Sequence, residues 1–148
     1  MIRTLQLFLL YLLATSCPLL AAESIGLVKS VRAGAQLQRG TQMIPLMVGV
    51  TVEAGDRIVT DGSGSAGIAL RDDTLLSVGP RSVLALDEFA FYPTTHAGVL
   101  GVNVVTGTLR MITGLIARQS PESVRIKTPN AAIGVRGTDF IVEVPKND

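Results

Sequence analysis

The chain has 148 residues, which is enough for one domain with a hydrophobic core of its own. Its 13 Lys and Arg residues nearly balance 12 Asp and Glu residues and are scattered singly, whereas nucleic acids and anionic membrane surfaces attract clustered positive charge. The single cysteine, Cys17, lies in a predicted leader, so no thiolate remains for catalysis or a Cys-type zinc site, and we expect neither metal nor small-molecule cofactor.

The first 22 residues have the pattern of an export signal. Arg3 supplies a positive start, residues 5–14 form an apolar segment, and Ala21-Ala22 form a small-residue cleavage site ahead of Glu23. The apolar segment is shorter than the about 20 clean residues that a spanning helix needs. We therefore predict a signal peptide at 1–22, a domain at 23–148, and a periplasmic or secreted location.

Two other interpretations of the leader stay open. Under the first, it remains uncleaved and anchors the domain to a membrane. Under the second, residues 14–17 form a lipobox and Cys17 is acylated, although Ala14 is a poor residue three positions before the cysteine. Contact with a membrane is expected only in these two cases.

Beyond the leader, apolar and polar residues alternate as they do in strands, and no stretch keeps helical spacing. Breaks that contain Gly, Pro or Asp recur at the short intervals typical of all-β domains. The predicted strands are residues 25–32, 35–39, 45–52, 57–60, 66–70, 74–78, 83–92, 99–105, 108–112, a short candidate at 115–118, and an interrupted stretch at 124–144.

This pattern predicts one compact all-β domain of short, mainly antiparallel strands. Alternation on nearly every strand favours a two-layer sandwich or roll, in which each layer has one buried and one wet face. A β-solenoid is the alternative architecture, although the residues show no fixed period.

Three features that resemble catalytic or ligand sites are better explained as loops. Residues 62–67 (GSGSAG) match a dinucleotide-binding pattern, but strand-like residues follow where a helix is needed. Asp72 and Asp73 are adjacent, so their carboxylates diverge on a strand, and aspartate is common in turns. His96 is a lone histidine in a loop composition. We predict that the protein is not an enzyme.

The stretch 123–144 is the most informative part of the sequence. Val124 and Ile126 alternate with charged residues until Pro129 interrupts the pattern. The apolar positions then change parity around Gly137, which predicts a β-bulge or a kink there. Polar side chains at such a position are displayed, so we predict Arg136 and Asp139 as partner-binding residues.

The same stretch carries a family resemblance. Residues 128–144 (TPNAAIGVRGTDFIVEV) resemble the closing signature of the FecR domain, and matching pieces precede them in order at 26–31, 49, 55–60, 69–75, 79–83 and 107–109. The motif residues that we assign to structural roles are Gly55, Asp56, Asp72, Asp73, Pro129, Gly137, Thr138 and Phe140.

The resemblance implies a regulatory role based on protein binding. In the proteins that this chain resembles, a cytoplasmic segment holds a sigma factor, a helix spans the membrane, and the periplasmic FecR domain receives a signal from an outer-membrane receptor. No residues precede this leader to contact a sigma factor, so we expect an exported signalling module in the periplasm or cell envelope that lacks direct sigma-factor binding. Its expected partner is an unidentified envelope protein.

Other functions stay open beside this one. An envelope scaffold or a glycan-binding module is the alternative, although a glycan site needs exposed aromatic residues and the domain has only Phe89, Phe91, Tyr92 and Phe140. A hydrolase that uses His96 is less favoured.

Residues 140–144 suggest how a domain could act without an active site. If this last strand lies at a sheet edge, its backbone can accept a strand from a partner, with Arg136 and Asp139 beside it supplying specificity. The alternatives are that the strand is central, and that Arg136 and Asp139 pair with each other or cap turns.

N-terminal sequencing of the exported protein tests the leader. Because Ala21-Ala22 fits a cleavage site, the exported protein should begin at Glu23. An acylated Cys17 or an intact Met1 at the N-terminus would contradict cleavage and identify a lipoprotein or an anchor, respectively.

Overall fold

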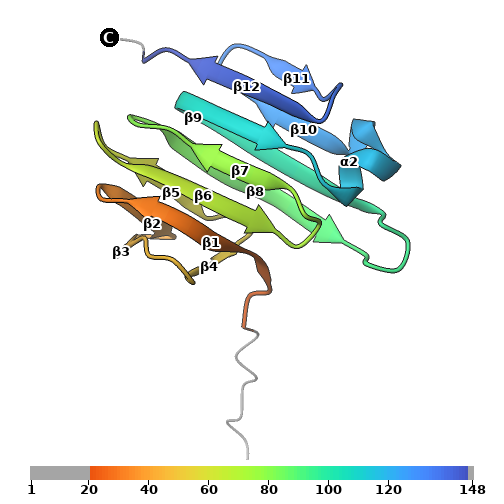
Figure 1. Ribbon diagram of the computed structural model, residues 1–148, viewed down its shortest axis with the longest axis horizontal. Helices are drawn as coiled ribbons and strands as arrows, with labels where there is room; N and C mark the ends of the chain where they lie inside the picture. Colours follow the sequence, from red (N-terminus) through yellow and green to blue (C-terminus); the bar gives the residue numbers. More distant parts are fainter. Residues whose placement is uncertain (1–20, 147–148) are drawn as a thin grey trace, which may run out of the picture.

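The computed structural model describes residues 21–146, which form a single, mostly β domain (Figure 1). The predicted leader and Cys17 lie outside the described residues, apart from Ala21 and Ala22. In the described part of the chain, no helix has the length and apolar character needed to cross a membrane.

Twelve strands and two short helical segments make up this part of the chain. In order they are β1 (Ser24–Arg32), β2 (Ala35–Arg39), β3 (Gln42–Pro45), β4 (Thr51–Glu53), β5 (Arg57–Thr60), β6 (Ser65–Leu70), β7 (Leu75–Val78), β8 (Val83–Phe91), β9 (Gly98–Ile112), α2 (Leu115–Gln119), the 3₁₀ turn η1 (Pro121–Ser123), β10 (Val124–Lys127), β11 (Ala132–Gly134) and β12 (Asp139–Val144).

The strands form one strongly curled sheet, which resembles half of a barrel. The first half of β9 pairs with β8 and β10, and its second half pairs with β7 and β12. One layer therefore runs β3-β2-β5-β8-β9-β10-β11 and the other runs β4-β1-β6-β7-β9-β12 (Figure 1). All pairs are antiparallel except β9 with β10. The predicted all-β domain with mainly antiparallel strands is confirmed, but its two layers share β9 instead of forming separate sheets.

The bend in β9 lies at Gly107. This residue has φ of +89°, and a side chain on it would overlap Ser82. Ser82 occupies that space because its hydroxyl accepts a hydrogen bond from the Thr108 N–H at 2.9 Å. Buried residues on β9 also change parity here, from Leu100, Val102 and Val104 to Leu109 and Met111. A glycine is thus required for β9 to serve both layers.

The core lies between the two layers and is aliphatic. The largest fully buried side chains are Leu37, Ile58, Ile68, Leu76, Leu84, Leu86, Leu100, Leu109, Met111, Ile116, Ile126 and Val28. They come from alternate positions of strands in both layers, as the period of two predicts.

Two predicted strands are wrong, and the two predicted at 99–105 and 108–112 are one continuous strand, β9. Residues 115–118 belong to α2, which packs Ile116 and Ala117 against the core while the chain crosses from one layer to the other. Residues 45–52 do not form one strand, because residues 46–50 turn between β3 and β4. Leu46 and Val52 are buried, whereas Val48 is exposed.

Gly107→Ala should destabilise the domain by about 2–4 kcal/mol, because it combines a strained backbone with overlap against Ser82. Chemical denaturation checks this value. Gly40→Ala is the control, since Gly40 also has positive φ but open space around it, and it should cost about 1 kcal/mol. Equal losses for the two variants would show that the close approach at Gly107 is unimportant.

Candidate functional site

The candidate site is the side of the domain where β11 and β12 lie. A turn at residues 128–131 contains Pro129 and is closed by a 2.8 Å bond from the Thr128 N–H to the Ala131 carbonyl. β11 then pairs with β10 in one layer, whereas β12 pairs with β9 in the other. The chain therefore crosses between the layers at residues 135–138.

This crossing explains the change of parity in the sequence. Ile133 and Val135 contact the core from one layer, and Val142 and Val144 contact it from the other. The predicted bulge within one strand is therefore a kink between two strands. Gly137 lies in the kink with φ of +116°, a conformation that favours glycine.

The kink is fixed to the end of β9. The Thr113 N–H donates to the Thr138 carbonyl at 2.9 Å, and its hydroxyl lies 3.4 Å from the Gly137 carbonyl. Phe140, two residues further on, is half-buried against the core. Gly137 and Thr138 thus join the kink to β9, and Phe140 packs beside it.

β12 is an edge strand. It pairs residue by residue with β9 from Asp139 to Val144, and within the described residues no strand pairs with its other side. The first of the two predicted alternatives, an edge strand, is therefore confirmed. Backbone N–H and C=O groups along such an edge can accept another strand.

A groove of about 400 Å³ runs beside this edge. Ile133, Val135, Phe140 and Val142 give it an apolar lining, and Arg136 lies in its wall. On the outer face of β12, Ile141 is 65% exposed. The groove and the exposed isoleucine together place accessible apolar surface along this edge.

Asp139 and Arg136 do not pair with each other. Asp139 accepts two hydrogen bonds from Arg110 on β9, at 3.0 and 2.7 Å. Hydrogen bonding to Arg110 lowers the pKa of Asp139, so this ion pair persists as the pH falls into the ordinary carboxyl range. Sequence analysis missed Arg110, whose only signal is its polar position in an alternating strand.

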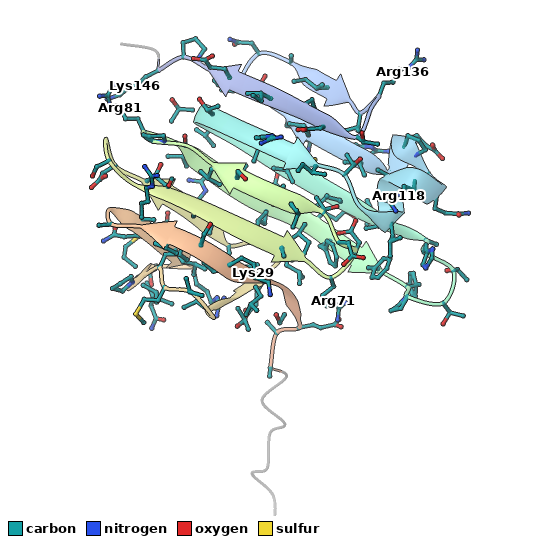
Figure 2. All side chains as sticks on the ribbon, viewed as in Figure 1. Lys29, Arg71, Arg81, Arg118, Arg136 and Lys146 are labelled. Atoms are coloured by element: carbon teal, nitrogen blue, oxygen red, sulfur yellow. The ribbon has the colours of Figure 1, made fainter. Side chains whose placement is uncertain are left out.

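Arg136 is exposed and points away from the body of the domain (Figure 2). Within residues 21–146 it has no ion pair, so its guanidinium is available to a binding partner. The two predicted residues thus differ: Asp139 belongs to a local ion pair, and Arg136 lies at the mouth of the groove.

The upstream motif residues stabilise turns. Asp56 is buried and accepts hydrogen bonds from Arg39 at 2.9 and 2.7 Å and from the Glu53 N–H at 2.8 Å. Gly55 beside it has φ of +91°.

The second pair of motif residues forms the predicted turn. Asp72 is buried and accepts a 2.7 Å bond from the Thr74 hydroxyl, and Asp73 takes the left-handed φ of +65°. The Asp72 carbonyl also accepts the N–H of Leu115 at 2.7 Å, which fixes the start of α2.

The remaining candidates lie in loops. The stretch 62–67 runs from a loop into β6, and Asp61 accepts the N–H groups of Ser63 and Gly64 at 2.8 Å each. The loop joins β5 to β6, which lie in different layers and do not pair, so it is not a hairpin loop. His96 is exposed in the β8–β9 loop and stacks on Phe91. Within residues 21–146, no three His, Cys, Asp or Glu side chains are grouped as metal ligands would be.

Fold and site together define a mostly β domain in which the edge strand β12 lies beside a groove. The chain belongs to the FecR family, since its sequence matches the family described as FecR protein over residues 56–148, more than half of its length. A comparison with curated proteins finds no match. A solved structure titled "Cell surface anchoring domain" is 28% identical, with 42% of this chain and 83% of that chain covered and a TM-score of 0.40. That likeness assigns nothing further to this chain.

Gly137→Val should destabilise the domain by about 1–3 kcal/mol, because a β-branched residue is strained at positive φ. Thermal or chemical unfolding measures the change. Gly134→Val is a matched control, since Gly134 is near the kink, has open space and lacks positive φ; it should change stability by less than about 0.5 kcal/mol. A Gly137→Val protein as stable as wild type would mean that the kink does not require this conformation.

Proposed function

We propose that this protein is an exported, non-enzymatic module that binds an extended segment of a partner protein along the β12 edge. The observation that carries the proposal is the unpaired side of β12, which within residues 21–146 lies beside an apolar groove of about 400 Å³. A segment that adds a strand there gains backbone hydrogen bonds and buries alternate side chains in the groove.

Side chains around the edge would select the segment. Inward-facing side chains of the added strand would contact Phe140 and Val142, which favours apolar residues. On the outer face, Ile141 favours an apolar neighbour, and the exposed Glu143 favours a basic one. Arg136 at the mouth would pair with an acidic residue at one end of the segment.

We place this activity in the periplasm or cell envelope and assign it a regulatory, signalling role. Membership of the FecR family and the export pattern of residues 1–22 support both assignments. The partner is then an envelope protein, and a sigma factor is not contacted directly.

Peptide selection tests strand capture without requiring that the natural partner be known. A library of random dodecapeptides displayed on phage is selected against the full chain, and the enriched peptides are synthesised. Their affinity should fall at least about ten-fold for Ile141→Lys, because a charge at the centre of the edge opposes strand addition. Val48→Lys is the matched control, since Val48 is 66% exposed and lies outside the groove.

Two further measurements identify the binding mode. N-methylation of alternate peptide bonds should abolish binding, because it removes the N–H groups that an added strand must donate. Arg136→Ala should reduce the affinity of peptides with a terminal acidic residue while leaving the melting temperature unchanged. Selection that yields no peptide sensitive to both Ile141→Lys and N-methylation would overturn the proposal.

A further inference from the structure

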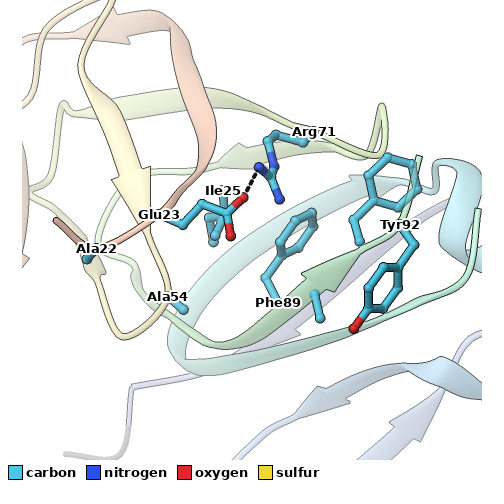
Figure 3. A pocket seen from close by; sticks show the side chains of 9 residues that line it. Ala22, Glu23, Ile25, Ala54, Arg71, Phe89 and Tyr92 are labelled. Atoms are coloured by element: carbon cyan, nitrogen blue, oxygen red, sulfur yellow. Dashed lines mark hydrogen bonds and ion pairs between the residues drawn. The ribbon is translucent and has the colours of Figure 1, made fainter. Parts of the chain in front are cut away.

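A second cavity, of about 390 Å³, opens between the start of β1 and the end of β8, and it shares no residue with the groove beside β12. Phe89, Phe91 and Tyr92 line it, together with Arg71 after β6 and Glu23 before β1. Figure 3 shows Arg71 bonded to Glu23 on one side of Phe89 and Tyr92 on the other. The domain therefore gathers most of its few aromatic residues in one place.

The hairpin between β8 and β9 holds the rings. Phe89 and Phe91 are two residues apart in β8 and so face the same side of the strand. The Tyr92 N–H donates to the Ala97 carbonyl at 2.9 Å, and the His96 N–H donates to the Tyr92 carbonyl at 2.8 Å. The His96 ring stacks on Phe91, with centroids 6.4 Å apart and planes inclined by 15°. The lone histidine thus supports the aromatic wall.

The charged side chains of the cavity form one ion pair. The Arg71 guanidinium lies 5.9 Å from the centre of the Phe89 ring and forms an ion pair with Glu23. Within residues 21–146, no other charged side chain lines the cavity. A charged ligand would have to displace this pair, whereas a neutral ligand can bind beside it.

Polar groups in the cavity retain unused hydrogen-bonding capacity. Arg71 has five N–H donors, and in the described part of the chain its side chain donates only from Nη1 to Glu23 Oε1. The other oxygen of Glu23 and the Tyr92 hydroxyl have no partner among the same residues. Tyr92 is 64% exposed, so its ring is accessible from solvent.

We propose that this cavity is a binding site for a neutral saccharide. A pyranose ring has an apolar face of C–H groups that packs on aromatic rings, and a rim of hydroxyls that both donate and accept hydrogen bonds. Phe89, Phe91 and Tyr92 match the apolar face, and Arg71 with Glu23 match the hydroxyls. The cavity also falls within the about 300–1,000 Å³ typical of small-molecule sites. This site does not depend on strand capture at β12.

Saturation-transfer difference NMR on the full chain tests the site. Aromatic protons of the protein are irradiated in the presence of cellotriose, maltotriose or chitotriose, with glucuronate and 4-hydroxyphenylacetate as anionic probes. At least one neutral saccharide should receive saturation on the C–H protons of one ring face. Tyr92→Ala and Arg71→Met should each weaken binding of that saccharide about ten-fold or more. The first removes an aromatic ring that packs on the sugar, and the second removes a hydrogen-bond donor to its hydroxyls.

Matched variants separate binding from folding. Tyr92→Phe keeps the ring and should bind within about three-fold of wild type. Ile141→Lys, on the β12 edge, should bind as wild type does, so the two proposals fail independently. All variants should melt with the wild type, since Tyr92 and Arg71 are exposed. Absence of binding by all three neutral saccharides, binding unaffected by both Tyr92→Ala and Arg71→Met, or tighter binding of the anionic probes would overturn the proposal.

Discussion

The passage of β9 from one layer to the other is the constraint on which the rest of the structure depends. This strand pairs with β7, β8, β10 and β12, and Gly107 allows the bend because a side chain there would overlap Ser82. Since one strand serves both layers, the sheet curls around an aliphatic core without a second, separate sheet in residues 21–146. Because β9 passes between the layers, the last strands of the two layers, β11 and β12, lie next to each other, and a groove lies beside them.

The opposite side of the domain is closed in a different way. Residues 46–50 cross between the layers there and are bonded to both, through the Leu46 N–H to the Ala35 carbonyl at 3.1 Å and the Gly49 N–H to the Val28 carbonyl at 2.9 Å. Leu46 and Val52 fill the space between the layers. Near β12 the chain crosses between the layers at residues 135–138, and the groove lies beside this crossing.

The sequence predicted features of the fold that depend on residues close together in the chain. It did not predict features that depend on contacts between residues far apart in the chain. The kink at Gly137, the turn at Asp72-Asp73 and the alternation of β12 are local properties, and the structure has them. α2 has five residues, too few to show helical periodicity, and its conformation follows from the crossing between layers. Asp139 pairs with Arg110, 29 residues away, because the register of β12 on β9 brings them together. The aromatic cavity likewise brings together Glu23, Arg71 and Tyr92. These residues are far apart in the sequence, and no motif spacing connects them.

An exposed edge beside an apolar groove is also a risk of aggregation, and the residues around β12 limit that risk. Pro145 and Lys146 follow the strand, and the exposed Glu143 lies near its end; proline and charge at such positions discourage indiscriminate pairing. Two copies of β12 paired antiparallel about Ile141 would place Asp139 of one opposite Glu143 of the other, a contact between like charges. Ile141, midway between them, remains open to a strand whose charges complement the edge. The side chains that oppose self-pairing are therefore the ones that would determine which segment the edge accepts.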